Sequence, residues 1–167
     1  IVSGMRASDL EVHSIACNGV THSSELVSYA MDLGQTVCRT EWLWTVHSDC
    51  FVHNPAALEE MLGYADGGRV PVIGYQSIPR PGCDWWHGMV SHTCSLFHLP
   101  AVDALGATWS MRRLRALAGS FWPREDLASR LDTEVLINET FRRAGITPML
   151  LGEESTAGVE RDERRVH

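Results

Sequence analysis

The segment His47-Ser48-Asp49-Cys50 combines residue types at a spacing that suits metal chemistry. It follows residues 42–46, whose Trp-Leu-Trp-Thr-Val sequence predicts a β-strand. Residues two apart in an extended chain face the same side, so His47 and Asp49 could both reach one divalent cation. Asp49 would supply a hard oxygen ligand and His47 an imidazole. The plain alternatives are a turn-forming aspartate and a half-buried, hydrogen-bonded histidine.

The elements around this segment alternate between strand and helix. Alternating or buried apolar runs predict strands at residues 10–16, 42–46, 70–76, 89–99 and 146–151. Apolar spacing, caps and glycines predict helices at residues 25–38, 56–64, 100–106, 110–118 and 132–144. We therefore expect one α/β domain over residues 1–167, an αβα sandwich with a mostly parallel central sheet. Ligands of such sheets bind beyond the carboxyl ends of the strands, where the His47 segment lies.

Residues 18–62 resemble the middle of the GT-A-fold, family-2-like nucleotide-sugar glycosyltransferases. In that family a helix rich in small residues precedes a triplet such as Thr-Glu-Trp. A strand follows, ending in an Asp-x-Asp motif, and then come an aromatic residue, a proline and a short helix. This order is matched here by Thr40-Glu41-Trp42, the strand, the His47 segment, Phe51 and Pro55. His47 replaces the first aspartate of the motif, and Asp49 holds the second position.

The resemblance implies a Rossmann-like GT-A fold and transfer of a sugar from a UDP- or GDP-sugar donor to an acceptor hydroxyl. The residues that it assigns to the donor are His47, Ser48, Asp49 and Arg80. Some members use a late histidine as a further ligand of the divalent cation, Mn or Mg. The implied metal ligands here are therefore Asp49, His47 and His167. The family's first, base-binding strand has no counterpart before Leu10, so we expect an N-terminal segment to be missing.

The resemblance also implies an acceptor site and a catalytic base. The residues that it assigns to acceptor contacts are Trp85, Trp86, His87 and His92. An acidic residue near the start of a later helix takes the proton of the acceptor hydroxyl in the family, which indicates Asp132 or Glu134 here. The plain alternatives are a helix N-cap for Asp132 and a solvated first-turn carboxylate for Glu134.

Composition narrows the class of protein further. The net charge of −7 argues against free nucleic acid as a partner. The chain has no lysine, which excludes Schiff-base or P-loop lysine chemistry in this segment. No apolar run is long enough to cross a bilayer. The five cysteines form no Cys-x-x-Cys pair, and we expect reduced thiols in a cytoplasmic protein.

Two other functions stay open at this point. One is a non-catalytic module of the same fold that binds a sugar or a partner, which the His47 replacement and the missing first strand favour. The other is a zinc metallohydrolase, although the spacings match no known zinc motif. Its ligands would come from Cys50, His53, Cys83, His87, His92, Cys94 and His98.

Overall fold

A central mixed sheet organises the part of the chain that the computed structural model describes, residues 22–47, 50–77, 88–124, 130–151 and 159–161. Its strand order is β1-β4-β3-β5. The strands are β1 (Trp42–Val46), β3 (Val72–Gln76), β4 (Val90–His98) and β5 (Met149–Leu151). β4 is antiparallel to β1 and β3, and β3 is parallel to β5. The carboxyl ends of β1, β3 and β5 therefore lie at one edge, where β4 begins.

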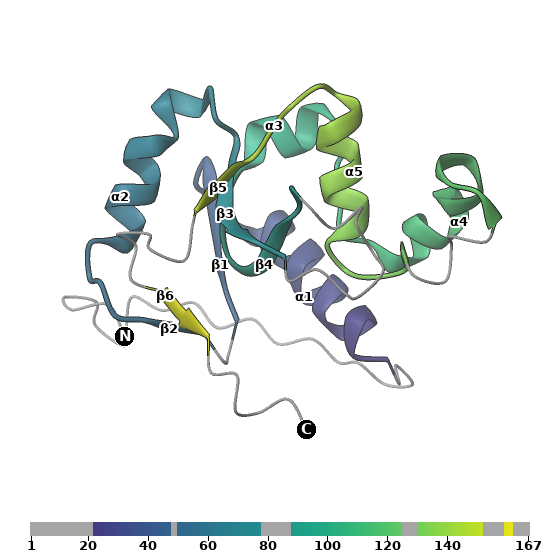
Figure 1. Ribbon diagram of the computed structural model, residues 1–167, viewed down its shortest axis with the longest axis horizontal. Helices are drawn as coiled ribbons and strands as arrows, with labels where there is room; N and C mark the ends of the chain where they lie inside the picture. Colours follow the sequence, from purple (N-terminus) through teal and green to yellow (C-terminus); the bar gives the residue numbers. More distant parts are fainter. Residues whose placement is uncertain (1–21, 48–49, 78–87, 125–129, 152–158, 162–167) are drawn as a thin grey trace.

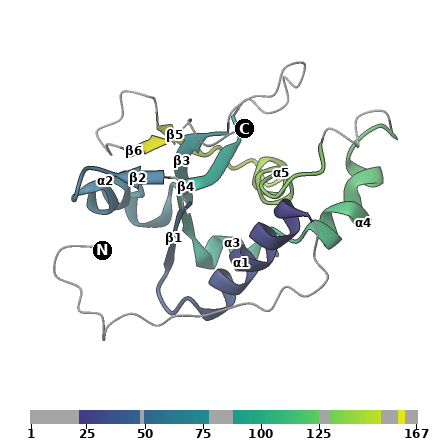
Figure 2. The ribbon, with the colours of Figure 1, turned by 90° about the horizontal axis from the view of Figure 1, so that it is seen from below.

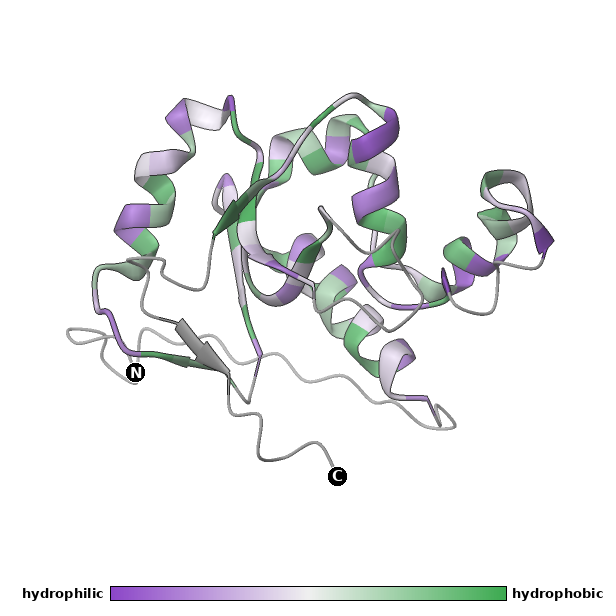
Figure 3. Cartoon of the chain, viewed as in Figure 1, coloured by the Kyte–Doolittle hydropathy of each residue, from purple (hydrophilic) through white to green (hydrophobic). Residues whose placement is uncertain are grey.

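Helices cover both faces of the sheet (Figures 1 and 2). Those on one face are α1 (Ser23–Val37), α3 (Leu99–Ala104) and α5 (Val135–Arg143), with α4 (Met111–Phe121) beyond them. The opposite face carries α2 (Ala57–Tyr64), which is followed by a 3-10 turn at Asp66–Gly68. Figure 3 shows hydrophobic and hydrophilic positions alternating along α2 and α5, as amphipathic helices require. The molecule is thus an α/β protein with helical layers on either side of a sheet.

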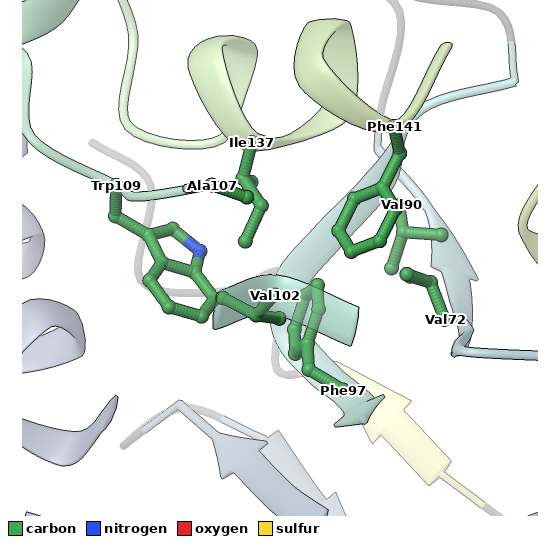
Figure 4. Close-up of a cluster of buried hydrophobic side chains, with 8 residues drawn as sticks. All are labelled: Val72, Val90, Phe97, Val102, Ala107, Trp109, Ile137 and Phe141. Atoms are coloured by element: carbon green, nitrogen blue, oxygen red, sulfur yellow. The ribbon is translucent and has the colours of Figure 1, made fainter. Parts of the chain in front are cut away.

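The larger hydrophobic core lies between the sheet and the α3–α5 face (Figure 4). Phe97 of β4 meets Trp109 edge to face, with ring centroids 5.1 Å apart. Both side chains are almost fully buried. The other members of this cluster are Val72, Val90, Val102, Ala107, Ile137 and Phe141. A second cluster on the opposite face joins Met61 of α2 and Ala65, just after this helix, to Ile73 and Leu96 of the sheet.

Gly74 allows β3 and β4 to approach closely where their register shifts. A Cβ at this position would lie 2.0 Å from Ser95 Oγ and 2.7 Å from Val90 Cγ1. Glycine therefore fits at a position where any side chain would collide with those of Ser95 and Val90. Just beyond the shift, the Ser77 N–H donates to the Met89 carbonyl at 2.8 Å. The end of β3 is therefore fixed beside the start of β4.

Most elements predicted within the described residues are confirmed, the strand predicted at residues 10–16 lies outside them, and the expected sheet is corrected. The sheet is mixed rather than mostly parallel, since β3–β5 is the one parallel pair that the described strands form. The reason is that β4, the next described strand after β3, pairs with it directly in the antiparallel direction. The sequence also gave no signal for β2 (Cys50–Val52) and β6 (Val159–Arg161), which pair antiparallel.

Helix starts differ slightly from the predictions. Asn54 was expected to cap a helix from residue 56, but α2 starts at Ala57 and the Asn54 side chain accepts from the Ala56 N–H at 2.9 Å.

Among the helices described, none is long and apolar enough to cross a membrane.

Candidate functional site

Four polar side chains converge on the edge of the sheet where β1 and β3 end. His47 follows β1, Ser77 follows β3, and His92 lies near the start of β4. Glu134 occupies the N-cap position of α5, which packs over this edge. The antiparallel direction of β4 brings its first residues to the same edge as the last residues of its neighbours. Residues that are distant in sequence therefore form one constellation.

Glu134 is the centre of this constellation. It is 5% exposed, and its two carboxylate oxygens have different partners. Ser77 Oγ donates to Oε1, and His92 Nδ1 lies 2.5 Å from Oε2. An ionised carboxylate only accepts hydrogen bonds, so Nδ1 of His92 must carry the proton. The contact therefore leaves the lone pair of a neutral His92 on Nε2.

Asn138 ties the first turn of α5 to the start of β4. Its side chain accepts from the Val90 N–H and donates to the Val90 carbonyl, both at 2.9 Å. The same amide nitrogen also donates to the Glu134 carbonyl at 2.8 Å. Because Val90 is almost fully buried, this clamp satisfies backbone groups that water cannot reach. It holds Glu134 opposite His92.

His47 lies next to His92 on the neighbouring strand. The backbone N–H of His47 donates to the Thr93 carbonyl at 2.8 Å, which extends the β1–β4 ladder by one residue. The two imidazole rings meet edge to face, with centroids 5.5 Å apart and an interplanar angle of 72°. The structure thus joins His47, predicted for the donor and metal, to His92, predicted for the acceptor.

Asp132 occupies a different environment from Glu134. Its Oδ1 accepts from Ser24 Oγ at 3.0 Å and from the Thr133 N–H at 2.8 Å. Its carbonyl accepts from the Val135 N–H at 3.2 Å. Asp132 therefore closes the turn before α5 and links it to the start of α1. Of the two predicted base candidates, Glu134 is the one that contacts His92.

Several predicted site residues lie outside the described residues. They are Ser48, Asp49, Arg80, Trp85, Trp86, His87 and His167. Their neighbours in the chain are informative, since His47 and Cys50 flank Asp49 and Ser77 precedes the segment with Arg80. The flanking residues lie at or beside the edge that carries Glu134. The roles predicted for the seven residues outside the described part of the chain stay predictions.

The candidate metal ligands are spread over the described structure. No cluster of three or more His, Cys, Asp or Glu that could hold an ion occurs among the described residues. His98 lies at the opposite end of β4 from His92, about 20 Å away at the rise of a β-strand, so the two cannot share a zinc ion. His47 and His92, by contrast, are close enough for two imidazoles to bind one ion.

Cys94 and Cys50 lie near this edge and are both buried. Burial raises the pKa of the Cys94 thiol, and hydrogen bonds with Trp44 and Cys50 offset only part of that effect. Cys94 is therefore a thiol rather than a thiolate at neutral pH, which suits packing better than metal ligation.

Sequence reasoning missed Ser77 and Asn138. Ser77 lies just after the strand predicted at residues 70–76, where a single serine indicates no particular role. Asn138 lies between Val135 and Phe141, two members of the apolar face of the predicted helix. A polar side chain within an apolar helical face must find a buried partner, and that position was the available signal.

Comparison of the chain with models of protein families, with curated proteins and with solved structures finds no match.

Proposed function

We propose that the protein transfers a sugar from a nucleoside-diphosphate donor to an acceptor hydroxyl, at the edge where β1 and β3 end. The single observation that carries this proposal is the convergence of His47, His92 and Glu134 next to the segment with Asp49. A GT-A-like arrangement of the sheet is part of the same proposal. It is supported by the order of α1, β1, the His47 segment and α2, which follows the order of the resembling sequences.

The proposed donor residues are His47, Ser48, Asp49 and Arg80, with Asp49 and His47 toward the cation. A divalent cation bound there would offset the negative charge that develops on the departing diphosphate. His47 fits this role by position, because its backbone is fixed to β4 and its ring lies at the edge of the sheet. Arg80 would contact the phosphates as a bidentate donor.

Glu134 is the proposed base for the acceptor hydroxyl. Ser77 and His92 each occupy one of its oxygens, but a carboxylate oxygen has two acceptor positions. Each oxygen therefore keeps one position for a substrate proton. Asp132, which bonds to Ser24 and Thr133, is the weaker candidate. Trp85, Trp86 and His87 remain proposed acceptor contacts.

Calorimetric titration with UDP, GDP and their sugar conjugates, with and without Mn²⁺, tests this function. We expect one donor to bind only in the presence of the metal, and Asp49→Ala to abolish that binding. Asp103→Ala is the matched control, because Asp103 is an exposed carboxylate that bonds to Gln35 on the surface. Its donor affinity should equal that of the wild type.

Other outcomes of the titration would point elsewhere. Full sugar transfer by Asp49→Ala would show that the donor site is wrongly assigned. If a well-folded protein binds none of these nucleotides, the proposed transferase is wrong and a non-catalytic binding module takes its place. Stoichiometric zinc that is bound through cysteine thiolates would instead favour the metallohydrolase.

A further inference from the structure

We infer that His92 and His47 together bind one transition-metal ion, and that Glu134 orients His92 for this purpose. In the sequence His92 is assigned to acceptor contacts, and to a metal only in the alternative zinc site. The inference rests on the proposed function for the role of the ion, and it narrows the identity of that ion. It is carried by the contacts of His92 on its two sides, one with a carboxylate and one with a second imidazole.

One ring nitrogen of His92 pairs with a carboxylate. Histidines that bind metals almost always donate their other ring N–H to a carboxylate, a carbonyl or a water. His92 Nδ1 lies 2.5 Å from Glu134 Oε2, and Ser77 holds the other carboxylate oxygen. This arrangement fixes the tautomer with its lone pair on Nε2. No residue that the structure describes forms a hydrogen bond with that nitrogen.

The imidazole rings of His92 and His47 lie at a separation that suits one shared ion. Two imidazoles on one ion, with metal–nitrogen bonds of about 2.1 Å and about 1.2 Å from nitrogen to ring centre, have centroids about 5.4 Å apart at a tetrahedral angle. The observed separation of 5.5 Å is close to that value. The two histidines follow adjacent, paired strands, so their backbones are already held at this spacing.

The carboxylate of Glu134 contacts His92, one of the two histidines. The side chain of Glu134 is 7% exposed, and its described partners, Ser77 and His92, bring no permanent positive charge. A buried carboxylate without a permanent counter-charge is costly. A cation on His92 would offset this charge through the imidazole. The surroundings of Glu134 are therefore compatible with a cation bound at His92.

The ligand type selects the class of metal. Imidazole nitrogen suits Mn²⁺, Co²⁺ and Zn²⁺ increasingly well, whereas Mg²⁺ and Ca²⁺ prefer oxygen ligands. We therefore assign this site to a transition metal rather than to Mg²⁺. Two protein nitrogens occupy only two of the coordination positions of the ion, so further oxygen ligands can bind it.

Binding of the metal alone tests the inference without any sugar substrate. Mn²⁺ titration followed by electron paramagnetic resonance gives the affinity, and electron spin echo modulation counts the coordinating histidine nitrogens. For the wild type we expect one bound Mn²⁺ with two imidazole nitrogens, and much weaker binding of Mg²⁺ by competition. If Mn²⁺ does not bind, or binds without imidazole nitrogen, the inference is overturned.

His92→Asn separates ligation from structure. The asparagine amide can replace Nδ1 as donor to Glu134, but it has no counterpart of Nε2. We expect Mn²⁺ to bind at least about tenfold more weakly and to show one imidazole nitrogen instead of two. Glu134→Gln keeps His92 but weakens the acceptor that orients it, and the loss should be about 10- to 100-fold. His22→Ala, which removes an exposed imidazole at the start of α1, should bind as the wild type does.

These outcomes separate the inference from the proposed function. Wild-type affinity in His92→Asn would overturn the inference while leaving Mn-dependent donor binding intact. Two-histidine binding of Mn²⁺ by a protein that binds no nucleotide sugar would support the inference and contradict the transferase. If His92→Asn does not fold, as judged by circular dichroism, the nitrogen count of the wild type decides alone.

Discussion

Glu134 and Glu139 are two buried carboxylates about one and a half turns apart on the same helix, and their surroundings are opposite. Glu139 accepts from Arg142 and Arg143, with distances of 2.5 to 2.7 Å. Glu134 is held by a serine and a histidine instead. One carboxylate thus has its counter-charges on its own helix, while the other points toward the ends of the sheet strands.

This difference indicates which carboxylate stabilises the protein and which is available for chemistry. The two arginines of Glu139 lie three and four residues further along α5, where a helix brings side chains together. That pairing is complete within α5. The contacts of Glu134 come from β3 and β4, so its position depends on the tertiary structure around the proposed site.

The largest expected effect is on sugar transfer. Glu134→Gln removes the proposed base, so we expect kcat to fall by about 10²- to 10⁴-fold with the donor identified by titration. Glu139→Gln makes the same chemical change at the other carboxylate and should leave kcat within about twofold, because it touches no proposed substrate group. Steady-state kinetics of the two variants at matched folded fractions gives the answer. Equal losses in both would end the functional distinction between the two carboxylates.

A smaller effect, on stability, is expected from loss of the Asn138 side chain, which positions Glu134. Asn138→Ala leaves the N–H and the carbonyl of buried Val90 without the side chain that pairs with them. We expect the free energy of unfolding to fall by about 2 to 3 kcal/mol in urea denaturation. Asn54→Ala is the matched control and should cost only about 1 kcal/mol, since Asn54 accepts from the Ala56 N–H and donates to Glu60, and Ala56 is only partly buried. Similar costs for the two variants would contradict the clamp.

Local sequence signals predicted the elements, because periodicity and caps act over a few residues. Residues 42–46 were expected to form a strand, and β1 has the same bounds. The direction of β4 was not predicted, since pairing depends on contacts between distant segments. Residues 50–52 and 159–161 are too short to show a pattern alone, and they form strands only with each other.

The candidate site was predicted in part for the same reason. His47 and Glu134 each stood out through the segment around them. That His92 would meet both could not be read from spacing, because it requires β4 to run against β1 and α5 to pack over the shared edge. Ser77 gives no signal in the sequence and Asn138 only its position on an apolar helix face, yet their hydrogen bonds fix the position of Glu134.

The smallest expected effect distinguishes the carboxylates by pH. Burial alone would raise the pKa of Glu139, but hydrogen bonds and charge attraction from Arg142 and Arg143 outweigh it and hold this pKa below its ordinary value. A carboxylate with a lowered pKa in the folded state contributes stability above its unfolded pKa of about 4.3 and loses it as pH falls through the folded pKa. Glu139→Gln should therefore cost about 2 kcal/mol at pH 7 and progressively less below about pH 4.

Urea denaturation of Glu139→Gln and the wild type between pH 3 and pH 7 measures this difference. Asp66→Asn provides the control, because Asp66 and Arg69 form an exposed pair at 3.3 Å whose loss should cost no more than about 0.5 kcal/mol. A cost for Glu139→Gln that stays constant across this range would show that the arginines do not lower its pKa. Glu139 would then be buried for packing alone, and the contrast with Glu134 would rest only on the partners of Glu134.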